Sequence, residues 1–245
     1  MKISTIFGFI LGFGLILLVV FSKEGTEYFL NWSAFGITVG GTIAATIIYF
    51  SPKALGSAIL SFFAIFKGKQ YYPKHMVDII VQLSKEARNT SFINLVNSEY
   101  TNDVPFLKKG LILVADGMNS DEIRDRLTRE KYSISGQNKL GERVFRIAGS
   151  FAPMFGMMGT VIGLIAMLRM VETPEEVPAA MGLALVTTLY GLILASLVFK
   201  PISGKIRDKN QTDTRNREIL IEGILLIKIS ENPKKIEEKL LGYLN

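Results

Sequence analysis

Threonine hydroxyls are the most distinctive polar groups inside the long apolar segments of this chain. Thr160 lies in one such segment, and Thr187 and Thr188 are adjacent in another. A hydroxyl oxygen can replace part of a cation's hydration shell, and oxygen ligands suit hard cations. The alternative is that a hydroxyl bonds back to its own helix and serves packing, and we favour that interpretation for the threonine repeat of residues 38–46.

Several kinds of chemistry are missing from the sequence. The 245 residues include no cysteine and a single histidine, His75, which excludes disulfides, thiolate sites and histidine clusters. No glycine-rich phosphate loop and no nucleophile–base pair in a recognisable context is present. We therefore predict that the protein is not an enzyme and holds neither a metal nor a cofactor.

The apolar segments contain no charged residue in their central parts. An ion-driven membrane protein needs a group that binds and releases the ion, and charged residues within membranes are normally functional. If this chain works with ions, the titrating carboxylate must come from another polypeptide.

Four uncharged segments are long enough to cross a bilayer, which takes about 20 apolar residues per helix. They cover residues 3–22, 31–51, 147–168 and 177–199. The first is longer than the apolar part of a signal peptide and has no convincing cleavage site, so we interpret it as a retained helix. The sequence predicts four transmembrane helices.

Loop charges predict the orientation. Residues 52–145 carry 14 Lys and Arg against 10 Asp and Glu, and residues 200–245 carry 10 against 7. The loops 23–30 and 169–178 are acidic, with one basic residue each against two and three acids. Because basic loops stay in the cytoplasm, both termini and the long middle segment are expected inside. This orientation explains the basic pI without nucleic-acid binding.

Helical periodicity extends through both charged segments, with apolar faces in residues 76–86, 106–114 and 219–227. We therefore predict an all-α integral membrane protein with a helical cytoplasmic domain between spans two and three and a cytoplasmic C-terminal helix. The predicted domains are listed in chain order: 1–51 (spans one and two), 52–145 (cytoplasmic helical domain), 146–201 (spans three and four) and 202–245 (cytoplasmic C-terminal segment).

Two prolines mark the cytoplasmic ends of the last two spans. We expect Pro153 to open the third span and Pro201 to close the fourth, because proline removes a backbone donor and bends or ends a helix. They are either simple punctuation or a paired hinge at the inner mouth. Three Gly-x-x-x-Gly pairs, of which Gly159/Gly163 is one, suggest close helix packing.

The third and fourth segments carry specific motifs. Residues 152–164 read APMFGMMGTVIGL, and residues 184–191 read ALVTTLYG, followed by Pro-Ile at 201–202. Together with EGIL at 222–225 and the ENP that precedes EEKL near the C-terminus, these motifs resemble the MotA/PomA family of flagellar stator subunits. The resemblance extends over essentially the whole chain.

The resemblance implies a stator unit. In the family, five copies of this subunit surround two copies of a MotB-like single-span partner, which is anchored to peptidoglycan and carries the ion-binding aspartate. Flow of H⁺ or Na⁺ along the interface turns the ring, and its cytoplasmic part pushes the rotor protein FliG. The localisation implied is the bacterial inner membrane.

The resemblance also assigns residue roles. Pro153 and Pro201 match the two functional prolines. Thr160 and Thr188, together with Thr187, match hydroxyls near the ion path, a feature that the resemblance associates with sodium-type members. The coupling ion itself stays open. Arg88 matches the rotor-facing arginine. The family often has a glutamate eight residues later, where this chain has Val96. Glu99 is the nearby acid that we place at the rotor interface.

Two other functions stay open from the sequence. One is an ion-driven energiser of the ExbB/TolQ type or a non-flagellar relative, although ExbB-like subunits have three spans. The other is a membrane scaffold without ion flow. A neighbouring gene for a single-span protein with an intramembrane Asp and a peptidoglycan-binding domain would favour the stator.

Overall fold

The computed structural model describes residues 2–22, 29–66, 71–169 and 177–244, with the side chains of residues 2–6 left out. Within these ranges every regular element is a helix and no strand occurs. The chain divides into two compact units. Unit 1 contains residues 1–67 and 138–207, and unit 2 contains residues 68–137 and 208–245.

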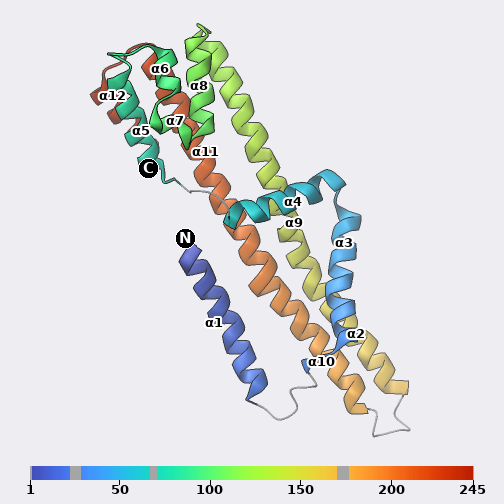
Figure 1. The fold of residues 1–245 in the computed structure, drawn as a ribbon. Helices are drawn as coiled ribbons and strands as arrows, with labels where there is room; N and C mark the ends of the chain where they lie inside the picture. Colours follow the sequence, from blue (N-terminus) through green and yellow to red (C-terminus); the bar gives the residue numbers. More distant parts are fainter. Residues whose placement is uncertain (1, 23–28, 67–70, 170–176, 245) are drawn as a thin grey trace. The chain divides into compact units, whose positions relative to one another are not determined.

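Unit 1 is built from apolar helices (Figure 1). Its elements are α1 (Lys2–Phe21), α2 (Trp32–Phe35), η2 (Gly36–Gly40), α3 (Gly41–Tyr49), α4 (Pro52–Phe66), the later part of α9 (Ser120–Arg169), α10 (Val177–Ile193), η3 (Leu194–Phe199) and the start of α11 (Lys200–Lys228). Asn31 caps α2, since its Oδ1 accepts from the Ala34 N–H at 2.9 Å.

Three helices among the described residues are long and apolar enough to cross a membrane. They are the continuous helix of residues 32–49, the apolar part of α9, and the apolar part of the helix of residues 177–228. The part of α1 whose side chains are described, Phe7–Phe21, is a shorter apolar helix. The structure therefore supports membrane-spanning helices, while the count of four stays a prediction.

The helices containing the two prolines continue through them, which corrects the expected helix ends. Pro153 lies inside α9, which runs unbroken from Ser120 to Arg169. Pro201 is the second residue of α11, directly after the π-helical turn η3. A π-helical turn is wider than an α-helical turn and offers room to accommodate a ring without an N–H, so the helix need not end there.

Unit 2 packs seven helical segments around one apolar core. They are α5 (Pro73–Glu86), α6 (Phe92–Val96), α7 (Glu99–Asn102), α8 (Pro105–Ala115), the first part of α9, the later part of α11, and α12 (Pro233–Leu241). Fully buried side chains from six of them meet in the core: Ile80, Leu95, Leu107, Leu127, Ile224 and Ile236. The helical periodicity predicted from the sequence is confirmed here.

Charged residues tie α9 to α11 across this core. The Arg124 guanidinium donates to Glu222 at 3.0 Å, and the Lys131 ammonium lies 3.0 Å from Glu218. Lys131 is buried, and its ammonium also lies 4.5 Å from the centre of the Tyr132 ring. The Lys131–Glu218 pair helps fix the register of the two helices, because loss of Glu218 would leave a buried cation without its partner.

Candidate functional site

The hydroxyls of Thr160 and Thr188 form a direct hydrogen bond between α9 and α10. Their Oγ1 atoms are 2.5 Å apart, and either atom can be the donor. Both side chains are half-buried in the described subunit. Two residues separated by 28 positions therefore bring two oxygens to one point within apolar helices.

A backbone carbonyl completes this cluster. The Ala184 oxygen lies 3.2 Å from the Thr160 Oγ1 and 3.4 Å from the Thr188 Oγ1, and the Gly156 oxygen lies 3.1 Å from the Thr160 Oγ1. Each hydroxyl has one proton but two lone pairs, so donation inside the cluster leaves acceptor capacity unused. Neutral oxygens arranged this way can coordinate a partly dehydrated hard cation or hold a water chain.

Thr187 is more deeply buried than its neighbour Thr188, although the sequence alone does not distinguish the two residues. Its side chain is completely buried, and its hydroxyl donates to the Ala184 carbonyl at 2.9 Å. Its own carbonyl accepts from the Thr38 hydroxyl at 3.3 Å. Thr187 therefore links α10 to η2 inside the protein, whereas Thr160 and Thr188 offer oxygens at a partly open surface.

Glycines let α9 and α10 approach closely enough for this pair to form. A Cβ at Gly159 would lie 2.5 Å from the Cβ of Thr187, and one at Gly163 would lie 2.8 Å from the Cβ of Ala184. On the other helix, a Cβ at Gly191 would lie 2.6 Å from the Ala152 carbonyl oxygen. The predicted packing role of Gly159/Gly163 is confirmed.

The other two glycine pairs behave differently. They are Gly36/Gly40 and Gly8/Gly12. A Cβ at Gly36, Gly40 or Gly8 would meet open space within the described subunit, and of these four glycines only Gly12 approaches a neighbour, Leu197. The threonines of residues 38–46 also differ from one another in their hydrogen-bond partners. Thr42 and Thr46 bond back to the carbonyls four residues earlier, as predicted for packing residues, while Thr38 bonds across to α10.

A tyrosine that the sequence analysis did not select ties α10 to the start of α2. The Tyr190 hydroxyl donates to the Phe29 carbonyl at 2.5 Å and accepts from the Asn31 N–H at 3.3 Å. These backbone groups precede a helix and have no helical partner, so Tyr190 supplies one. The sequence feature that could have identified this contact is the single tyrosine within the apolar run that contains TTLYG.

Pro153 lies next to this helix seam. A Cβ at Gly191 would lie 3.2 Å from the Pro153 Cα, so the proline passes α10 at a position without a side chain. About one turn earlier on α9, Gly149 faces Phe199 and Lys200 at the junction of η3 and α11. Whether Pro153 and Pro201 act as a hinge stays a prediction.

The predicted rotor-contact residues lie in unit 2 and are exposed. Arg88 follows α5 in a turn, and Glu99 begins α7. The ion pairs among described residues do not join the two. Val96, at the position where the resemblance expects a glutamate, packs against the core of unit 2. The Glu99 carboxylate is therefore exposed to solvent, whereas the Val96 side chain is directed to the core.

The chain matches known proteins over its full length. Residues 99–219 match the model of the MotA/TolQ/ExbB proton channel family. Chemotaxis protein PomA of Vibrio alginolyticus is 33% identical, with 100% of this chain and 96% of PomA covered. Motility protein A of Borreliella burgdorferi is 35% identical, with 100% and 94% covered. The chain belongs to the MotA branch of the MotA/TolQ/ExbB proton channel family.

Solved structures of this branch share the fold. The flagellar MotAB stator complex from Bacillus subtilis contains a chain that is 31% identical, and the two superpose with a TM-score of 0.87 over 98% of this chain and 95% of that one. The MotA-type arrangement of helices described above is thus found in an assembled stator of a relative. The sequence-based recognition of the family is confirmed.

Proposed function

We propose that this chain is the MotA-like stator subunit of a bacterial flagellar motor and uses transmembrane ion flow to turn the rotor. The observation that carries the proposal is the Thr160–Thr188 oxygen cluster, which lies in the uncharged segments 147–168 of α9 and 177–193 of α10. Such a surface can line an ion path, but it has no group that titrates. Similarity to motility protein A, PomA and a MotAB stator complex over the whole chain supports this function.

The missing titrating group defines the partner. A MotB-like single-span protein, present as a dimer and anchored to peptidoglycan, would supply an aspartate beside Thr160 and Thr188. This chain would surround it as a pentamer. The transported ion is H⁺ or Na⁺, and we expect no bound cofactor, metal or enzymatic activity.

The membrane arrangement follows from the charge pattern. We propose four spans in the bacterial inner membrane with both termini in the cytoplasm, where α1 is the first span. Unit 2 would then lie in the cytoplasm. Its exposed Arg88 and Glu99 would contact the rotor protein FliG, through many brief charge contacts, because single exposed pairs contribute only about 0–1 kcal/mol. No contact with nucleic acid is expected.

The alternative is an ion-driven energiser of the ExbB/TolQ type. The family model includes such proteins by description, and it matches residues 99–219. Motility protein A of Borreliella burgdorferi and PomA of Vibrio alginolyticus match the chain from end to end at about one third identity, which favours the stator, whereas the name of YtxD from Bacillus subtilis, 35% identical, gives no function.

Reconstitution with and without a partner tests the function. The chain is co-expressed with the MotB-like protein from its own gene neighbourhood, placed in liposomes, and assayed for uptake of Na⁺ and H⁺ under an imposed voltage. We expect ion uptake from the complex, and none from the chain alone. Uptake by the chain alone at the same rate would overturn the shared-site proposal.

A further inference from the structure

Helix α4 presents two opposite faces, one docked and one open. The docked face carries small residues, and Ala54 and Ala58 pack with Val144 of α9. The approach is close, because a Cβ at Gly141 would lie 2.8 Å from the Ser57 carbonyl oxygen. The chain turns at Phe50 before α4 begins, and Figure 1 shows α4 running crosswise to α3 and α9.

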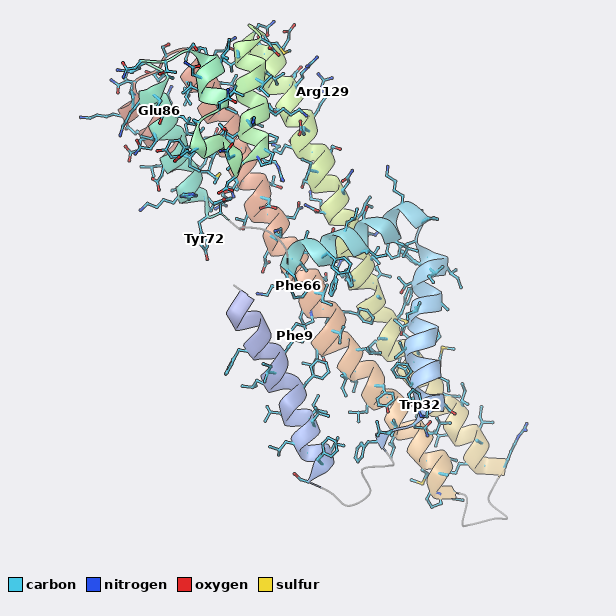
Figure 2. All side chains as sticks on the ribbon, in the orientation of Figure 1. Phe9, Trp32, Phe66, Tyr72, Glu86 and Arg129 are labelled. Carbon is cyan, nitrogen blue, oxygen red and sulfur yellow. The ribbon has the colours of Figure 1, made fainter. Side chains whose placement is uncertain are left out.

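The open face of α4 is apolar. Leu60 is 72% exposed and Ile59 is 59% exposed, and Phe63 and Phe66 are about half exposed. Figure 2 labels Phe66 at the end of this helix. With 15 residues, α4 is too short to cross a bilayer. A short helix with one docked face and one open apolar face can lie in the membrane interface with the apolar face toward the acyl chains.

Basic residues gather around α4 and the adjoining parts of unit 1. The ranges 51–66, 138–150 and 196–207 contain seven Lys and Arg and one acid, Glu142. That acid is already engaged, since it accepts from the Arg146 Nε at 3.2 Å and from the Ser203 hydroxyl at 3.0 Å. With Glu142 engaged by Arg146 and Ser203, the three ranges carry a net excess of six positive charges.

Two of these cations lie beside the docking site of α4. Lys139 and Arg143 are exposed on α9, on either side of Gly141, and the Arg143 guanidinium carbon lies 6.0 Å from the centre of the Phe50 ring. Among described residues, neither forms an ion pair. Apolar side chains on α4 and free cations on α9 therefore occur together.

We propose that this surface binds anionic phospholipids of the inner leaflet, with the apolar face of α4 among the acyl chains and Lys139 and Arg143 on the headgroup phosphates. The proposal rests on the membrane placement of unit 1 given under the proposed function. Charge complementarity selects the occupant. A second copy of the same surface would bring the same excess of cations, whereas a phosphate neutralises it.

Lipid titration of the full-length chain, co-purified with its partner in detergent, tests the proposal. Delipidated protein is mixed with phosphatidylglycerol or phosphatidylcholine, and bound lipid is counted by native mass spectrometry at low and at moderate salt. We expect about tenfold preferential retention of phosphatidylglycerol, which falls as salt rises. Equal retention of both lipids by the unmodified protein would overturn the proposal.

Matched variants locate the site. K139Q/R143Q should abolish the preference, whereas K74Q/K85Q, which removes two exposed cations from α5 in unit 2, should keep it. L60S/F63S should weaken retention of both lipids, because it removes the apolar contact. Equal loss in the α5 control, or full displacement of phosphatidylglycerol by inorganic phosphate, would exclude a lipid site at α4.

Ion uptake by the same preparations in liposomes separates this proposal from the stator function. A complex that conducts ions but shows no lipid preference contradicts only the lipid site. A complex that prefers phosphatidylglycerol but conducts no ions contradicts only the stator function.

Discussion

Thr160 on α9 and Thr188 on α10 share a hydrogen bond of 2.5 Å, and both hydroxyls face the Ala184 carbonyl. Thr160→Val keeps the volume but removes one oxygen from this cluster. Loss of one ion–oxygen contact of about 1.4 kcal/mol lowers the rate about tenfold, so we expect ion uptake and swimming speed to fall by at least that factor. Swimming speed against sodium concentration, with and without a protonophore, measures the effect and identifies the ion.

Two controls accompany this substitution. Thr160→Ser keeps the hydroxyl and should restore most of the activity. Thr42→Val affects a hydroxyl that bonds only to its own helix and should leave ion uptake unchanged. Equal losses in Thr160→Val and Thr42→Val would contradict a role for the oxygen cluster.

Gly191→Ala should destabilise the packing of α10 on α9. The new Cβ would lie 2.6 Å from the Ala152 carbonyl oxygen, so the helices must separate at a cost of about 1–3 kcal/mol. Gly182→Ala on the same helix meets open space within the subunit and should cost nothing. Thermal unfolding of the purified complex compares the two, and equal midpoints would contradict the close seam.

Pro153→Leu tests the hinge. Residue 153 lies inside a continuous helix, and leucine restores the N–H that can bond to the carbonyl of Gly149. We expect normal membrane levels and normal complex assembly, but no swimming. Normal motility at normal expression would show that Pro153 is not a hinge.

Arg88→Glu should impair swimming without changing the amount of protein in the membrane, because Arg88 is exposed and lies outside the core of unit 2. Lys85→Glu, three residues earlier and also exposed, is the matched control and should have a smaller effect. Immunoblots of membrane fractions alongside swimming assays distinguish loss of a rotor contact from loss of protein from the membrane. If motility follows the amount of protein in the membrane alone, the proposal that Arg88 contacts the rotor is wrong.

Tyr190→Phe should loosen the start of α2. Removal of the hydroxyl leaves the Phe29 carbonyl and the Asn31 N–H without this partner, which costs about 1–3 kcal/mol in an apolar setting. Tyr49→Phe removes the hydroxyl of an exposed tyrosine and should have little effect. Thermal unfolding of both variants in the same detergent gives the comparison, and identical midpoints would rule out the contact.

The sequence by itself determined the helices and the family. Uncharged runs of about 20 residues can only be membrane helices or buried ones, and the 3.6-residue periodicity of α5, α8 and α11 predicts their buried faces. The start of α12 is also encoded locally, because Asn232 caps the helix and Pro233 begins it. The absence of central charges in the spans pointed to a carboxylate from a second chain.

Tertiary structure decided which hydroxyls matter and where helices continue. Thr187 and Thr188 are equivalent in sequence, but adjacent residues on a helix point about 100° apart, so one is buried and the other pairs with Thr160. Likewise, proline predicts a helix end, yet α9 continues through Pro153, whose Cα passes α10 at Gly191, and α11 continues through Pro201 after the π-helical turn at 194–199. Such outcomes depend on the neighbouring helix, which local sequence does not contain.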